Sequence, residues 1–250
     1  MYITMSNKTT WLYGVNPVSE ALRSGRNIKS VHIYSGRRKG VGELRAEAEA
    51  RGIPVKVEKA EFFDNRFPKG HQGVAASIEQ KGYVSLEELL LIPGKRDEDP
   101  FFVVLDEVED PRNLGAVLRT AEAAGVHGVV IQKRRQAGLG PQAVKASAGA
   151  SEHIAVAAVP NIKNAIYKMR DMGIMVVGAE AGGDAVSWEA YLGGPLALVV
   201  GSEGRGLRRT VREKCDLVLS LPMRGLVNSL NASVAAGVLI YEALRQRLNK

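Results

Sequence analysis

The feature that most constrains the fold is a set of apolar, β-branched segments beyond residue 100. They occur at 101–105, 128–131, 174–177, 196–200 and 217–221. Helical patterns lie between several of them: Leu114, Val117, Leu118 and Ala121 follow the spacing 0, 3, 4, 7 of a helix face that closes at Gly125. Further helices are expected at about 164–172 and 232–248. A strand that is buried on both faces gives a continuous apolar run. The pattern therefore predicts an α/β fold with a parallel sheet covered by helices on both faces.

The first 80 residues contain shorter elements of the same two kinds. A helix is expected from about residue 16, a strand at 31–34, a helix at 43–51, and strands at 53–57 and 73–78. This region carries 13 Lys and Arg against 8 Asp and Glu, whereas residues 81–100 carry 3 against 5. The latter segment ends in a polar, turn-rich run at 93–100, typical of a linker. We therefore predict a small domain at 1–80, a linker at 81–100 and a larger domain at 101–250.

Composition and charge indicate which classes of ligand or partner the protein binds. The formal net charge is +7, which favours a polyanionic partner. Cys215 is the only cysteine and the four histidines are scattered, so neither a disulfide nor a metal site is expected. The N-terminal residues contain no apolar leader pattern, and we find no run of membrane-spanning length. A cytoplasmic protein without a membrane partner is expected.

The turn after the first strand of the larger domain excludes common α/β enzymes. Dinucleotide-binding proteins place a glycine-rich turn there. Residues 106–113 are acidic and contain no glycine. The chain also lacks the Gly-Lys-Ser/Thr sequence of a P-loop and the G-x-S-x-G sequence of a nucleophile elbow.

Three segments that follow predicted strands carry residues capable of chemistry. The segment 110–121 contains Asn113, which could also be a simple helix cap, and Arg119, which lies at the edge of the buried stripe. The segment 201–207 places Glu203 among three glycines, and the segment 221–237 carries Ser229 and Asn231 where a strand gives way to a helix. In an open α/β sheet such segments share one edge, which is the usual place of a ligand site.

In this order, the three segments resemble motifs 1, 2 and 3 of the SpoU family of the SPOUT methyltransferase superfamily. The likeness covers residues 101–250. The segments 13–22 and 71–74 resemble the substrate-binding domain of one subgroup, the bacterial enzymes that methylate a guanosine ribose in 23S rRNA. The resemblance thus spans nearly the whole chain.

The resemblance implies a deep trefoil knot in the C-terminal domain and a small RNA-binding N-terminal domain of the ribosomal-protein-like kind. It implies S-adenosylmethionine as cofactor and a ribose 2′-hydroxyl as methyl acceptor. The implied cofactor contacts are Gly201, Gly204, Gly206, Leu221, Met223 and Leu230. The implied catalytic residues are Asn113, Arg119, Glu203, Ser229 and Asn231.

Arg119 is the residue that the family resemblance assigns to activation of the 2′-oxygen. A guanidinium stays protonated in ordinary surroundings, so we favour stabilisation of a developing alkoxide over a literal base. Glu203, Ser229 and Asn231 would hold Arg119 and the ribose in line.

The resemblance also implies a homodimer whose active site is completed across the interface. Val234, Val238 and Leu239, expected on one side of the last helix, are candidate contacts, although that helix could equally belong to the core. The loop residues Arg37, Arg38 and Lys39 could contact RNA phosphates or could form a solvated loop; the resemblance favours RNA.

Two other functions stay open at this point. A tRNA ribose methyltransferase would share the catalytic domain, because the choice of target would lie in residues 1–80. A non-catalytic RNA-binding or ribosome-assembly factor would have no reason to keep Asn113, Arg119, Glu203 and Asn231.

Overall fold

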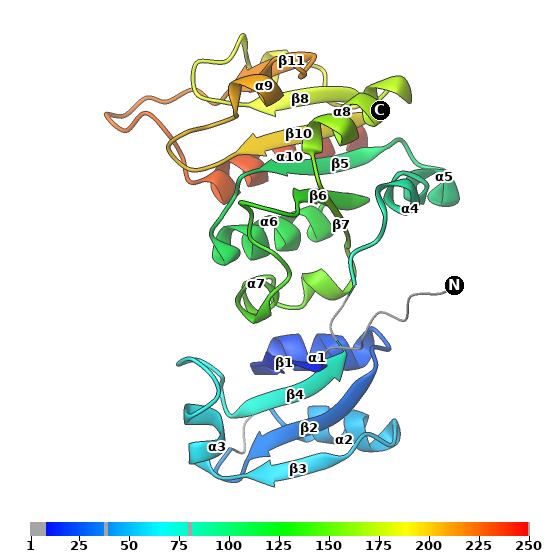
Figure 1. Ribbon diagram of the computed structural model, residues 1–250, viewed down its shortest axis with the longest axis vertical. Coiled ribbons are helices and arrows are strands. Elements are labelled where there is room, and N and C mark those ends of the chain that lie inside the picture. The colour runs from blue at the N-terminus through cyan, green and yellow to red at the C-terminus, as the bar shows by residue number, and fades with distance from the viewer. Residues whose placement is uncertain (1–8, 38–39, 80–81, 250) are drawn as a thin grey trace.

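The computed structural model describes residues 9–37, 40–79 and 82–249. It has two α/β domains stacked along the long axis of the molecule (Figure 1). The N-terminal domain contains the elements β1 (Thr9–Tyr13), α1 (Val15–Arg23), β2 (Ile28–Tyr34), α2 (Gly42–Ala50), β3 (Val55–Glu58), α3 (Ala60–Asp64) and β4 (Val74–Glu79).

The N-terminal sheet is mixed. Its order is β1-β4-β2-β3, in which β4 runs antiparallel to β1 and β2 while β2 and β3 are parallel. Helices α1 and α2 pack on it through Val18, Leu22 and Leu44, which are buried. A second cluster, of aromatic side chains from β1 and the α3 region, includes Tyr13 and Phe67. The domain therefore has an aliphatic and an aromatic core.

The C-terminal sheet is parallel, as predicted. Among the described residues seven strands form it in the order β7-β6-β5-β10-β8-β11-β9, and each strand runs parallel to its neighbours. The strands are β5 (Phe101–Asp106), β6 (Gly128–Gln132), β7 (Ala155–Val159), β8 (Met175–Ala179), β9 (Ala185–Val186), β10 (Leu196–Gly201) and β11 (Leu217–Ser220).

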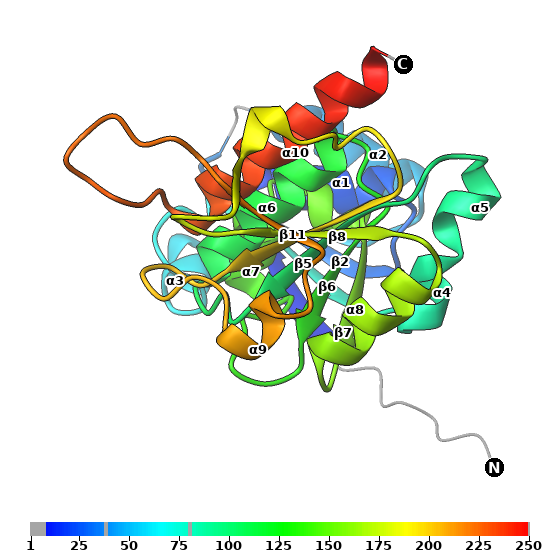
Figure 2. The same ribbon diagram turned by 90° about the horizontal axis from the view of Figure 1, so that it is seen from above.

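Helices cover both faces of this sheet, as the continuous apolar strands require (Figure 2). Helices α6 (Pro111–Ala123) and α10 (Ala232–Leu248) pack on one face, and α4 (Leu86–Leu90) and α8 (Ile162–Asp171) pack on the other. The remaining helical elements are α5 (Ile92–Arg96), α7 (Pro141–Ala146), α9 (Arg209–Arg212) and the 3₁₀ turns η1 (Ala150–Glu152) and η2 (Ser187–Glu189).

Two details differ from the sequence-based expectation. The predicted linker contains α4 and α5 within residues 82–100, and Leu86, Leu89 and Leu90 are buried in the core of the second domain. A capping box between Ser85 and Glu88 starts α4. Leu239 also does not share a side with Val234 and Val238: it is 1% exposed, because it faces the sheet, whereas both valines are exposed.

The two domains contact each other through polar pairs and through α7. Arg26 forms an ion pair with Glu152, and both side chains are largely buried. The His153 ring donates to Glu20 at 2.7 Å, and α7 packs beside β1 with Val144 in the N-terminal core. No helix within the described ranges is long and apolar enough to cross a membrane.

Candidate active site

The carboxyl ends of four neighbouring parallel strands position the site. Strands β5, β10, β8 and β11 lie side by side, and Gly201 at the end of β10 pairs with Asp106 at the end of β5. The chain leaves these strands into α6, the loop 201–207, the turn after Ala179 and the segment 221–231. Because all four exits share one edge, motifs that are far apart in sequence meet there.

A hydrogen-bonded polar cluster joins one residue from each motif. The Asn113 side-chain amide donates to Glu203 Oε1 at 2.8 Å. The Asn231 amide donates to Asn113 Oδ1 at 3.1 Å and to the same Glu203 oxygen. Asn113 is buried, while Glu203 and Asn231 are exposed at the cluster's open side. The carboxylate is thus held by two amide donors from helix starts on the same face of the sheet.

Local helix signals place both asparagines. Asn231 is the N-cap of α10, where its Oδ1 accepts from the backbone N–H groups of Ser233 at 2.9 Å and Val234 at 3.4 Å. Asn113 lies in the first turn of α6, which Asp110 caps and Pro111 begins. The capping oxygen and the donating nitrogen of Asn231 therefore belong to one amide, so the cap orients the donor.

A cavity of about 280 Å³ lies beside the cluster, between the loop 201–207 and the segment 221–231. All six residues that the resemblance predicts as cofactor contacts line it: Gly201, Gly204, Gly206, Leu221, Met223 and Leu230. Ser229 and Glu203, from the predicted catalytic set, also line it. The size is near the lower end of the range for small-molecule pockets.

Glycines are required where the loop 201–207 turns back on itself. Ser202 and Gly206 exchange backbone hydrogen bonds of 3.1 and 3.0 Å, and a side chain on Gly201 would overlap the backbone of Gly206. Gly204 and Gly206 have φ of 75° and 64°, which L side chains rarely adopt. The glycine spacing is thus a requirement of the turn that lines the cavity.

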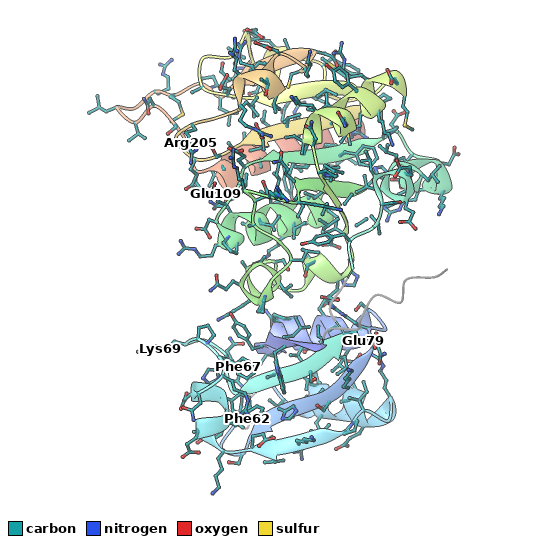
Figure 3. All side chains as sticks on the ribbon, viewed as in Figure 1. Phe62, Phe67, Lys69, Glu79, Glu109 and Arg205 are labelled. Carbon is teal, nitrogen blue, oxygen red and sulfur yellow. The ribbon has the colours of Figure 1, made fainter. Side chains whose placement is uncertain are left out.

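A second, smaller cavity of about 230 Å³ adjoins the first. Both are lined by Ser202, Glu203 and Arg205, and the second also by Asn113 and Glu109. Figure 3 shows the labelled Glu109 and Arg205 on the same side of the molecule. The loop 201–207 therefore separates two compartments, with Glu203 facing both.

Sequence reasoning missed two charged residues at these cavities. Arg205 lines both of them, and a cation between the glycines of the second motif could have drawn attention to it. Glu180, after β8, lines the larger cavity, and its Oε2 accepts from Arg212 Nε at 2.9 Å. Nothing in the sequence links Glu180 to the motifs, because only the strand order brings β8 beside β10.

An ion pair links Arg208, the residue after the loop 201–207, to Asp106 at the end of β5. Arg208 donates from its backbone N–H and its Nε to Asp106, at 2.9 and 2.6 Å. Burial raises the pKa of the Asp106 carboxyl, against the opposing effect of its hydrogen bonds to Arg208. A buried carboxylate of this kind needs its partner, so the pair stabilises the position of the loop.

Arg119 lies apart from the polar cluster within one chain. It is exposed on α6 and lines a cleft of about 800 Å³ between the domains, together with Glu122 and His153. A residue six positions after Asn113 is about one third of a turn away around the helix, which explains the separation. Glu203 thus contacts two asparagines, not Arg119 as expected.

The predicted RNA loop of the N-terminal domain is described only in part. Arg37 is half-buried, and its Nε is buried without a hydrogen-bond partner among the described atoms. Arg38 and Lys39 lie outside the described residues. The RNA-binding role of this loop stays a prediction.

Comparison with known proteins identifies the family. Residues 100–241 match the SpoU rRNA Methylase family, and residues 11–84 match a domain described as RNA 2′-O ribose methyltransferase substrate binding. The chain belongs to the SpoU family. It is an RNA 2′-O-ribose methyltransferase of this family.

Relatives of similar length support this assignment over nearly the whole chain. Bacillus subtilis YacO, named for the TrmH family of tRNA/rRNA methyltransferases, is 43% identical over 97% of this chain and 98% of its own. The 23S rRNA (guanosine-2′-O-)-methyltransferase RlmB of Yersinia pestis is 38% identical, covering 94% of this chain and 97% of its own.

A solved structure confirms the cofactor at the level of the family. The SpoU methyltransferase AviRb from Streptomyces viridochromogenes, in complex with AdoMet, is 26% identical with a TM-score of 0.80. The match covers 97% of this chain and 92% of AviRb. The prediction of S-adenosylmethionine as the cofactor of this SpoU family member is therefore confirmed.

Proposed function

We propose that this SpoU methyltransferase transfers a methyl group from S-adenosylmethionine to the ribose 2′-hydroxyl of a guanosine in 23S rRNA. The observation that carries the proposal is the pair of adjoining cavities that share Ser202, Glu203 and Arg205. One compartment suits the cofactor and the other the acceptor ribose, with the Asn113–Glu203–Asn231 cluster between them.

The larger cavity has the chemistry that S-adenosylmethionine needs. Leu219, Leu221 and Leu230 provide apolar walls for an adenine, and the crossing backbone at Gly201–Gly206 supplies polar groups close to the ligand. Glu180 and Glu203 bring carboxylates to a cofactor that carries positive charge. When bound, the cofactor supplies an activated methyl group on a sulfonium.

The residues of the chain then orient the acceptor and stabilise its oxygen. The carboxylate of Glu203, held by two amides, can accept a hydrogen bond from a ribose hydroxyl in the smaller cavity. Arg119 is proposed to stabilise the negative charge that develops on the 2′-oxygen, which a guanidinium does without giving up its own proton. Ser229, at the mouth of the cofactor cavity, would complete the positioning set.

Arg119 can serve this site only if a second copy of the chain supplies it. Arg119 lies on α6, which packs beside α10: its neighbour Thr120 contacts Gly237 of that helix. Along α10, Val234, Val238 and Tyr241 are 50%, 43% and 50% exposed, an apolar stripe that favours association. We therefore propose a homodimer in which α6 and α10 meet the partner and Arg119 enters the partner's site.

We also propose that the C-terminal domain is knotted, as its family resemblance implies. The strand order supports this, because β8 lies between β10 and β11 although it precedes both. The backbone of Gly183 also passes so close to that of Leu219 that no side chain would fit between them.

Complementation tests the shared site. Arg119→Ala should abolish methyl transfer while S-adenosylmethionine binding survives, and Asn113→Ala should also be inactive. Mixed after dissociation, the two inactive variants should recover about a quarter of wild-type turnover, because half of the dimers are mixed and each has one intact site. No recovery would refute a site made from two chains, and wild-type turnover of Arg119→Ala would refute its assignment.

The RNA target is tested by incubation with labelled cofactor and unmodified 23S rRNA or tRNA, followed by mapping of the blocked 2′-position. We expect a guanosine in 23S rRNA, in line with the RlmB relative that covers both domains. Modification of tRNA alone would favour the alternative target. Cofactor binding without transfer to either RNA would favour a non-catalytic factor.

A further inference from the structure

An aromatic groove of about 680 Å³ lies between the two domains. We define it by the rings of Trp11, Tyr13 and Phe67 from the N-terminal domain and Tyr83 from the connection, with Arg66 at its rim. The second domain closes it with Pro111 and residues 138–142. Its volume is in the range of sites that hold a small molecule or a nucleotide.

The rings of the groove are fixed in place before any ligand arrives. Tyr13 stacks on Phe67 with centroids 5.5 Å apart, and Trp11 meets Phe67 edge-on at 5.7 Å. Tyr83 is 43% exposed, yet its hydroxyl accepts from the Leu139 backbone N–H at 3.0 Å. Rigid aromatic side chains lose little entropy on binding, so the groove is prepared for flat ligands.

Cations lie close to the groove. Arg66, which lines it, has its guanidinium 4.4 Å from the centre of the neighbouring Phe62 ring, and Lys145 Nζ lies 5.0 Å from the centre of the Tyr13 ring. Lys69 is exposed nearby, on the side of the molecule that also carries Glu109 and Arg205 (Figure 3). Among the described residues that line the groove there is no Asp or Glu.

The other inter-domain cleft has the opposite character. It is the cleft that contains Arg119. Its described lining holds four carboxylates, Glu20, Glu43, Glu47 and Glu122, and two arginines, Arg23 and Arg119. Because the carboxylates outnumber the arginines, this cleft is less favourable for a polyanion than the groove. Between the two openings, the aromatic groove is the one that suits a nucleic acid.

We propose that the aromatic groove binds unpaired nucleotides of the RNA substrate, next to the segment that enters the active site. Bases stack on the rings of Tyr83 and Trp11, while Arg66 and Lys69 meet the phosphates. Paired bases cannot splay into the groove, so the site selects single-stranded RNA. The inference rests on the proposed function, because it deepens the RNA recognition of that enzyme.

Tryptophan fluorescence tests the groove directly. The chain has two tryptophans, and Trp188 is 60% exposed on η2, outside the groove. In the Trp188→Phe protein, Trp11 is the only reporter. We expect saturable quenching by a short oligouridylate and none by the same strand annealed to oligoadenylate. Absence of quenching, or equal quenching by the duplex, would overturn the proposal.

Two variant pairs separate stacking from charge. Tyr83→Ala should weaken oligouridylate binding about tenfold, whereas Tyr83→Phe, which keeps the ring and loses only the hydrogen bond to Leu139, should weaken it by less than about threefold. Arg66→Ala should weaken binding about fivefold and should lower the slope of log K against log salt concentration by about one. Arg23→Ala, the same change beside the acidic cleft, should alter neither the affinity nor the slope. Equal effects within either pair would overturn the assignment, and Arg66 is exposed enough to replace without unfolding.

Methyl transfer to 23S rRNA, measured on the same proteins, distinguishes failure of the groove from failure of the function. Transfer without quenching overturns the groove and leaves the enzyme. Quenching without transfer to any RNA overturns the proposed function and leaves the groove as an RNA-binding site.

Discussion

Replacing Asn231 by Asp separates the two tasks of that side chain. Its Oδ1 caps α10, and its Nδ2 donates to Asn113 and Glu203. An aspartate keeps the capping oxygen, since Asp and Asn are equally good N-caps. It loses both donated hydrogen bonds and places a second carboxylate against Glu203. The helix should therefore survive while the cluster opens.

The cost to the cluster follows from these contacts. Two lost hydrogen bonds are worth about 1–3 kcal/mol together. Two carboxylates at about 3 Å add about 1–2 kcal/mol of repulsion when, as here, both groups are exposed to water. If the cluster acts only in the transition state, a total of about 2–5 kcal/mol corresponds to a loss of about 30- to 5000-fold in kcat.

The assay is transfer of labelled methyl groups to unmodified rRNA, with thermal unfolding measured in parallel. Asn231→Ala should lose the same activity and, in addition, about 1 kcal/mol of capping, or about 2–4 °C in Tm. Ser233→Ala is the matched control: its hydroxyl bonds to the Asn231 Oδ1 at 2.6 Å but leaves both Nδ2 bonds intact, so its kcat should stay near that of the wild type. Wild-type turnover of Asn231→Asp would refute the positioning role of the cluster.

The remaining predictions concern packing and protonation. Gly201→Ala places a methyl group against the Gly206 backbone. A thermal shift assay should therefore show a Tm lowered by several degrees and no stabilisation by the cofactor. An unchanged Tm would contradict the close approach of the two backbones. Burial raises the pKa of Cys215 to about 12, so iodoacetamide at pH 8 should alkylate the thiol only after unfolding in urea. Burial lowers the pKa of His32 and His127 below their ordinary 6.5, because both rings are folded into the protein in neutral form. Unfolding releases them to take up protons, so stability should fall as the pH drops below about 6.5; a flat denaturation midpoint between pH 7 and 5 would contradict this.

Much of the fold was available from local patterns. The apolar runs at 101–105 and 196–200 predicted buried parallel strands, and the structure confirms them, because a strand covered on both faces tolerates few polar side chains. Strand β7 (Ala155–Val159) was missed, because an alanine-rich segment carries little β-branched signal. The helices α4 and α5 within 82–100 were not predicted, because the polar residues of this segment outnumber the three leucines that pack in the core.

The sequence by itself predicted three motifs that each follow a strand, and residues from the second and third line one cavity. Only the tertiary structure decided how they are combined. Strand order, which no local pattern encodes, brings β8 beside β10 and adds Glu180 to the larger cavity. Helix geometry turns Arg119 away from Asn113, so Glu203 binds two asparagines instead. Contacts between residues about a hundred positions apart depend on how the whole chain folds, and no local sequence pattern specifies them.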